Sequence, residues 1–194
     1  MIIKKKKTEK FVMPSGIGIY LEMTEDRIEN ARKNEKAAKQ AYDKDKSAEN
    51  KLDLIYAKSE RLYATGNYET AIEYLNKELA EFEATPPTSV PASLLKYIDV
   101  LSLKAYILMI GLKEPEQAVE VGLKVYEIVF QNFPETSECY FAADLYATCL
   151  RACGRDEEAV DIYKRTLDGL EYEISEIQAV RDEIIKNLKE IADE

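Results

Sequence analysis

The 194-residue sequence contains no histidine, which limits the chemistry that its side chains could perform. Ser–His and Cys–His nucleophile pairs and histidine-ligated metals are therefore excluded. The remaining acid–base groups are carboxylates, lysines, tyrosines and thiols. In a chain with 37 Asp and Glu residues, many carboxylate pairs arise by chance, and spacing alone selects none of them. We therefore expect no enzymatic activity and no catalytic residue.

The other reactive side chains are three cysteines, Cys139, Cys149 and Cys153, an odd number without the spacing of a disulfide framework. Cys149 and Cys153 lie four residues apart and would share one face of a helix. A structural zinc site, however, needs four Cys or His ligands. The pattern favours reduced thiols in a core, and we expect no metal and no cofactor.

A glycine-rich segment, Ser-Gly-Ile-Gly at residues 15–18, is the nearest approach to a phosphate-binding loop. It lacks the third glycine of a dinucleotide fingerprint and the Gly-Lys-Ser/Thr of a phosphate loop. No parallel sheet is predicted on either side of it, so we interpret the segment as a flexible hinge.

The charge is unevenly distributed: the chain carries −10 overall, while residues 1–10 carry a net +4 and the rest −14. An acidic body repels nucleic acid and anionic lipid, so neither is an expected partner, and the basic start is interpreted as a solvated tail. No apolar run approaches the roughly 18 residues of a membrane helix, and no apolar segment of a signal peptide follows the first lysines. We expect a soluble protein of the cytoplasm without a membrane span.

The elements that must position these groups are helices, because apolar residues recur at spacings of three and four between Asp53 and Gly169 and the breaks fall at Gly or Pro. The pattern predicts one all-α domain over residues 51–194. A last helix at 175–192 opens with the capping pattern Ser-x-x-Gln at Ser175. The six helices before it are expected at 51–65, 68–84, 92–112, 116–132, 137–152 and 156–167.

Residues 1–50 are expected to form a separate N-terminal region. It consists of the basic tail, an apolar arm at 11–23, and a charged helix or partly ordered linker from 24 onward. The linker contains almost no large apolar residue, so we expect it to be exposed and not packed.

The turns of the three helical hairpins share a pattern, which reads Gly-Asn-Tyr-Glu-Thr-Ala at 66–71, Lys-Glu-Pro-Glu-Gln-Ala at 113–118 and Gly-Arg-Asp-Glu-Glu-Ala at 154–159. The first closely resembles the tetratricopeptide repeat (TPR), the third keeps its Gly and Ala, and the second keeps only the Ala. The alanines are 47 and 41 residues apart, against 34 in the standard repeat, so the hairpins have longer helices or loops.

The resemblance implies a stack of three antiparallel hairpins whose first helices line a concave groove for a peptide. The narrow apolar stripe of the C-terminal helix suits a cap on the open end of that stack. Family members that clamp a terminal carboxylate use basic residues where this chain has Tyr56 and Glu60, so a clamp of that kind is not expected. The candidate partner-binding residues, aligned in register on the three first helices, are Tyr56, Glu60, Tyr63, Leu103, Ile107, Ile110, Asp144, Thr148 and Arg151.

The middle hairpin's first helix is apolar on every side, which predicts that something covers its groove face. The available covers are the arm at 11–23, a second copy of the chain, or a foreign peptide, and we expect the arm or a homodimer in the purified protein. The leading functional hypothesis is a protein–protein interaction adaptor or scaffold that binds a partner segment in the groove. The alternatives are a chaperone-like holder of a partner protein and a self-assembling structural protein.

Overall fold

The computed structural model describes residues 25–84, 87, 91–134, 136–169 and 185–186. The described chain is all-α, as the periodicity predicts. The arm at 11–23 lies outside the described residues, as does the helix expected at 175–192 apart from two helical positions at 185–186. The elements are α1 (Glu25–Lys44), α2 (Ala48–Ala64), α3 (Tyr68–Ala84), α4 (Pro91–Tyr106), the π-helical segment η1 (Ile107–Leu112), α5 (Pro115–Asn132), α6 (Ser137–Ala152) and α7 (Asp156–Gly169).

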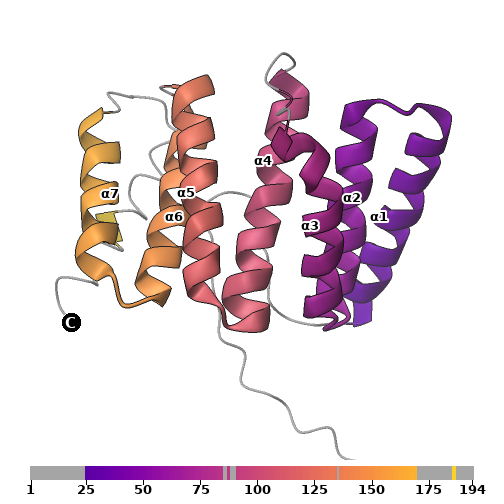
Figure 1. Ribbon diagram of the computed structural model, residues 1–194, viewed down its shortest axis with the longest axis horizontal. Helices are drawn as coiled ribbons and strands as arrows, with labels where there is room; N and C mark the ends of the chain where they lie inside the picture. Colours follow the sequence, from indigo (N-terminus) through magenta and orange to yellow (C-terminus); the bar gives the residue numbers. More distant parts are fainter. Residues whose placement is uncertain (1–24, 85–86, 88–90, 135, 170–184, 187–194) are drawn as a thin grey trace, which may run out of the picture.

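The helices pack in the order of the chain as antiparallel neighbours, in a row that runs from α1 to α7 (Figure 1). Each helix packs on the one before it and the one after it. In addition, α2 packs on α4, and α3 packs on η1. None of the described helices has the length and apolar character that crossing a membrane requires.

The first and third hairpins turn at glycines in the left-handed region, with φ of +75° at Gly66 and +71° at Gly154. At the end of α2, the N–H of Gly66 donates to the carbonyl of Tyr63 at 2.9 Å, and the N–H of Asn67 donates to that of Leu62 at 2.9 Å. This pair of bonds is the Schellman arrangement that satisfies the last carbonyls of a helix. The predicted role of Gly66 as a helix stop is therefore confirmed.

The middle hairpin turns differently, because Lys113 occupies the left-handed position with φ of +60°. The helix predicted at 92–112 has two parts, since its last turn is the π-helix η1. The N–H groups of Lys113 and Glu114 both donate to the carbonyl of Leu108. The chain thus ends this helix without the glycine that the flanking hairpins use.

Gly111 lies inside η1 against an aromatic ring of the first hairpin. A Cβ added at Gly111 would lie 2.8 Å from Cγ and Cδ1 of Tyr68, the tyrosine of the first repeat turn. The Tyr68 ring in turn lies 5.5 Å from the ring of Tyr63, between centroids. The absence of a side chain at Gly111 therefore lets the second hairpin pack closely on the first.

The segment expected as an exposed helix or linker is the 20-residue helix α1, and it does pack on α2. The prediction that it buries little agrees with its contacts, because Ala31 is its one buried apolar residue among those described. Polar contacts replace the missing core: Glu35 forms an ion pair with Arg61, and the Arg27 guanidinium lies 5.4 Å from the centroid of the Tyr63 ring.

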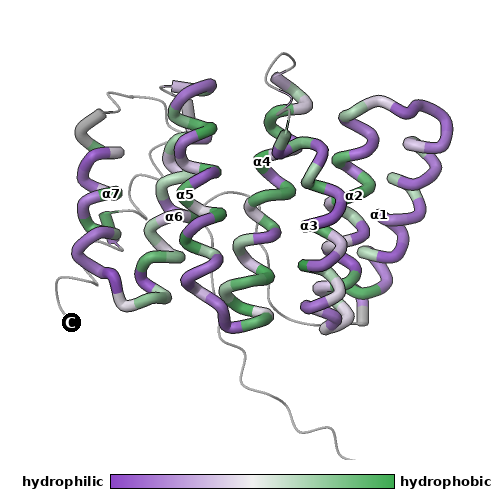
Figure 2. The backbone as a smooth tube through the Cα atoms, viewed as in Figure 1, coloured by the Kyte–Doolittle hydropathy of each residue, from purple (hydrophilic) through white to green (hydrophobic). Residues whose placement is uncertain are grey.

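The core runs along the middle of the row, where hydrophobic residues concentrate in α4 to α6, whereas α1 is mostly hydrophilic (Figure 2). The alanines of the three repeat turns, Ala71, Ala118 and Ala159, are each 0% exposed. Small side chains at these positions allow the two helices of each hairpin to approach closely. The shared turn pattern therefore reflects a shared packing requirement.

Candidate functional site

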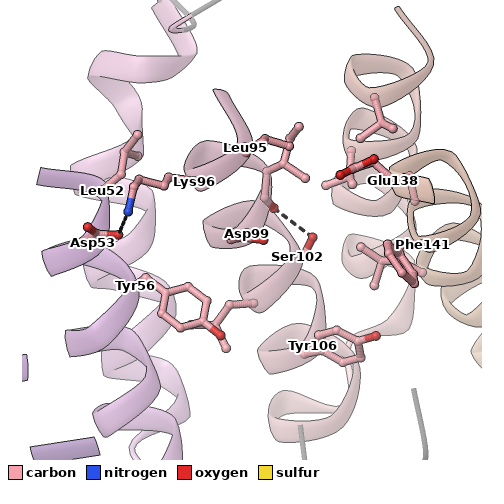
Figure 3. A pocket seen from close by; sticks show the side chains of 16 residues that line it. Leu52, Asp53, Tyr56, Leu95, Lys96, Asp99, Ser102, Tyr106, Glu138 and Phe141 are labelled. Atoms are coloured by element: carbon pink, nitrogen blue, oxygen red, sulfur yellow. Dashed lines mark hydrogen bonds and ion pairs between the residues drawn. The ribbon is translucent and has the colours of Figure 1, made fainter. Parts of the chain in front are cut away.

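A cavity of about 550 Å³ opens on α4, between α2 and α6 (Figure 3). The first helices of all three hairpins contribute to it, and α5 contributes two valines. Its lining consists of Leu52, Asp53, Tyr56, Leu95, Lys96, Ile98, Asp99, Ser102, Leu103, Tyr106, Val125, Val129, Glu138, Phe141, Ala142 and Leu145.

The cavity follows from how the hairpins stack. Among the described helices, α2 packs on α4, but α6 packs on α5 and α7 and not closely on α4. The space left between α4 and α6 is lined from α5 by the buried side chains of Val125 and Val129. Apolar side chains dominate the lining, and volumes of about 300–1,000 Å³ are usual for binding pockets. The arrangement suits an apolar group that enters from solvent.

Four charged side chains lie among these apolar groups: Asp53, Lys96, Asp99 and Glu138. The ammonium of Lys96 forms an ion pair with Asp53, which joins α4 to α2 (Figure 3). Glu138 lies across the cavity on α6, where the hydroxyl of Ser137 donates to it at 3.3 Å. Since the one lysine is paired, the lining has an excess of negative charge.

Asp99 is the carboxylate with the most perturbed environment in the cavity. Burial raises its pKa to about 6; Lys96 opposes this rise and the nearby Asp53 adds to it. Asp99 is nevertheless an exposed residue of the cavity lining, so water still reaches its carboxylate. No hydrogen bond or ion pair satisfies it within the described part of the chain. The negative charge of Asp99 is therefore balanced in part by nearby Lys96 and otherwise by water.

Two tyrosines and a serine supply the other polar groups. Burial raises the pKa of Tyr56 to about 12 and holds that of Tyr106 well above its ordinary value, so both remain neutral phenols. The hydroxyl of Ser102 donates to the carbonyl of Ile98 at 2.9 Å and is thus engaged within α4. These groups can position a ligand, but none is an activated nucleophile.

Of the nine candidate residues, two line the cavity, Tyr56 and Leu103. Leu103 is 2% exposed, so it contributes a wall and little contact area. Half-buried Glu60 lies beside Tyr56 and raises its pKa. Ile110, in η1, is half-buried against the core.

The structure places the remaining five away from the cavity. Tyr63 and Ile107 are core residues, with 3% and 0% of their surfaces exposed. Asp144 is 3% exposed and accepts a hydrogen bond of 2.9 Å from the hydroxyl of Tyr163. Thr148 and Arg151 are half-buried near the end of α6. The Nε atom of Arg151 lies 4.0 Å from the carboxylate of Asp156.

The cavity lies roughly two helical turns before the expected register on each first helix, and sequence reasoning missed Asp99, Lys96 and Glu138. The sequence does contain a signal for Asp99 and Lys96. Asp99 and Lys96 are charged residues three apart in an otherwise apolar helix, and such residues mark the side that a buried helix turns toward solvent.

The thiols are not part of the cavity. Cys139 and Cys149 are buried and Cys153 is half-buried, and none of the three forms a disulfide bond. Burial, with contributions from Cys153 and Asp144, raises the pKa of Cys149 to about 12, so this thiol is a poor nucleophile. In the parts of the chain that the structure describes, no cluster of three or more His, Cys, Asp or Glu residues could hold a metal ion.

Fold and site together define a class: an all-α protein of sequentially packed antiparallel helices, with an apolar, acid-rimmed cavity on its middle helix. Comparisons of the chain with protein-family models, with curated proteins and with solved structures found no match.

Proposed function

We propose that the chain is a TPR-like interaction module of the cytoplasm that binds a short segment of another protein in the cavity on α4, without catalysing a reaction. The observation that carries this proposal is that the first helices of three consecutive hairpins contribute to one apolar cavity of about 550 Å³. This is the face that helical-repeat proteins of this type use for peptides. The cavity could bury one or two large side chains.

The proposal is tested by selecting binders from a display library of random 12-residue peptides on the immobilised full chain. Enriched peptides are then synthesised, and their Kd values are measured by fluorescence anisotropy. We expect peptides with at least one large apolar side chain and a Kd in the micromolar range, as is usual for a small apolar anchor of this kind.

A cavity-filling variant, Ser102→Leu, locates the site. Ser102 lines the cavity from a helix surface, so leucine there occupies the binding space without removing any core side chain. Peptide affinity should fall at least tenfold, with helical content unchanged. The matched control is Thr70→Leu, at an exposed position of α3, which should bind like the wild type. Equal binding by both variants, or no enriched peptide at all, would contradict the proposal.

A further inference from the structure

We infer that the segment taken by the cavity carries a lysine or arginine next to a large apolar side chain, so that the apolar group enters the cavity and the cation meets Asp99 with Glu138 opposite. This inference rests on the proposed function and deepens it by giving the chemistry of the partner. It depends on the charges around the cavity, which the apolar lining alone does not determine.

The first argument is the balance of charge in the lining. Asp53, Asp99 and Glu138 face one cation, Lys96, and that cation is already paired with Asp53. Two carboxylates, Asp99 of α4 and Glu138 of α6, thus form no ion pair among the described residues that line the cavity, although Lys96 acts on Asp99 from nearby. A segment with acidic side chains would be repelled here, and a neutral one would leave both charges uncompensated.

The second argument is the surroundings of Asp99. Its carboxylate faces Asp53 and Tyr56 of α2 and Lys96 of its own helix, and Glu138 of α6 lines the same cavity. The cavity walls partly desolvate Asp99 and so disfavour its charged form, although the residue is exposed, and a cation brought to it would offset this effect. A charge-assisted hydrogen bond to this carboxylate is about twice as strong as one between neutral groups.

The third argument concerns the partner's approach. The whole chain carries a net charge of −10, so its field attracts basic segments and slows the approach of acidic ones. Lysine and arginine also have apolar stems that can lie along Leu95 and Phe141 at the cavity's edge while the charged ends stay near the carboxylates.

The peptide selection described above tests this inference separately from the proposed function. The expected result is enrichment of lysine or arginine within two positions of a leucine, isoleucine or phenylalanine. Enriched peptides without basic residues that still lose binding to Ser102→Leu would overturn this inference and leave the proposed function standing. No enrichment at all would overturn both.

Charge-neutral variants then assign the preference to residues. With an enriched basic peptide as probe, Asp99→Asn and Glu138→Gln should each raise Kd about fivefold, and the matched controls Glu73→Gln and Glu120→Gln, at exposed positions of α3 and α5, should not. Wild-type affinity should also rise between pH 5 and pH 7.5, as Asp99 loses its proton, and should change less in Asp99→Asn. Unchanged affinity in both cavity variants contradicts the inference.

Two further measurements would recognise other occupants of the cavity. A mass of twice 22.2 kDa in solution that Ser102→Leu reduces to one copy would assign the cavity to a second chain. Peptide binding seen only after Lys4, Lys5, Lys6 and Lys7 are all changed to glutamate in the full-length protein would assign it to the chain's own basic segment. Either result overturns the inference of a foreign basic partner.

Discussion

The hydroxyl of Tyr163 on α7 donates a hydrogen bond of 2.9 Å to Oδ1 of Asp144 on α6, and both side chains are buried. The bond joins the two helices of the third hairpin within its core. Asp144 is therefore held by the packing of α6 on α7 and does not face the cavity.

Replacing Tyr163 with phenylalanine removes this donor and keeps the ring. Because a buried acidic group then loses a hydrogen bond, we expect Tyr163→Phe to lower the free energy of unfolding by about 2 kcal/mol. Urea unfolding followed by circular dichroism measures the change. Tyr42→Phe removes a hydroxyl at a half-buried position of α1 and should cost far less. Equal small losses in both variants would mean that the bond adds little.

Removing the hydroxyl of Ser59 should have the opposite effect. Ser59 is 0% exposed on α2, and its oxygen has no hydrogen-bond partner within the described chain. A buried, unsatisfied hydroxyl costs about 1–3 kcal/mol, and alanine is the better helix former. Ser59→Ala should therefore raise the midpoint of urea unfolding, and a lower midpoint would show that the hydroxyl has a stabilising partner.

The turn at Lys113 offers a stabilising substitution, because this residue has φ of +60°. Left-handed backbone costs a residue with a side chain about 1 kcal/mol more than glycine, so Lys113→Gly should raise the free energy of unfolding by about 0.5–1 kcal/mol.

Gly66→Ala, at the left-handed position of the first hairpin's turn, is the control for Lys113→Gly. At Gly66 φ is +75° and no neighbouring atom lies within 4 Å of an added Cβ, so only the backbone conformation is tested. A loss of about 1 kcal/mol is expected. If Lys113→Gly were destabilising while Gly66→Ala behaved as expected, contacts of the Lys113 side chain would be stabilising the turn.

The contact between Gly111 and Tyr68 predicts a non-additive pair of substitutions. Gly111→Ala places a methyl group 2.8 Å from the inner ring atoms of Tyr68, and we expect a loss of about 1–3 kcal/mol from overpacking. In a Tyr68→Ala background the clash is absent, so the same substitution should be neutral or stabilising. A double-mutant cycle followed by thermal unfolding measures this coupling. Additive losses of stability would mean that η1 does not depend on the close approach of Gly111 to Tyr68.

Asp99 should make stability depend on pH in a definite direction. Its pKa is raised to about 6 in the fold, mainly by burial, against about 3.9 in an unfolded chain. The folded state therefore binds the proton more tightly, and the stabilisation present below pH 4 is lost as the pH rises through 6. Asp99→Asn removes this dependence.

The measurement for Asp99 is urea unfolding of the wild type and Asp99→Asn at pH 4 and pH 7. The variant should be the more stable of the two at pH 7, and its advantage should shrink at pH 4. Glu73→Gln, which removes one negative charge from an exposed position, corrects for net charge. A pH-independent difference between Asp99→Asn and the wild type would contradict the assignment.

The sequence predicts more of the fold than of the cavity. Helix stops at Gly66 and Gly154 and close helix approach at Ala71 follow from local chemistry, and the sequence contains them directly. The π-helical end of the fourth helix could not be predicted, because it accompanies the approach of Tyr68 to Gly111, a contact between hairpins. Where helices form and end depends on local sequence, whereas the π-helical turn depends on a tertiary contact.

The site was harder to predict for a related reason. Which residues of α4 face a cavity depends on how far α6 lies from it, and that separation is set by the packing of both helices on α5. The register expected from the sequence therefore placed Ile107 and Asp144 in the groove, although packing buries both of them. It did not include Asp99 and Glu138, which line the cavity.

The packing of each helix on its neighbours in the chain also bears on the order in which the molecule forms. Hairpins joined by connections as short as residues 65–67 can close quickly, since little chain entropy is lost, and each can then dock on the one before it. The cavity, however, draws on residues from Leu52 to Leu145 and is complete only when α6 has docked. Asp99 and Glu138 therefore come to line one cavity late, after most of the helices that support them are in place.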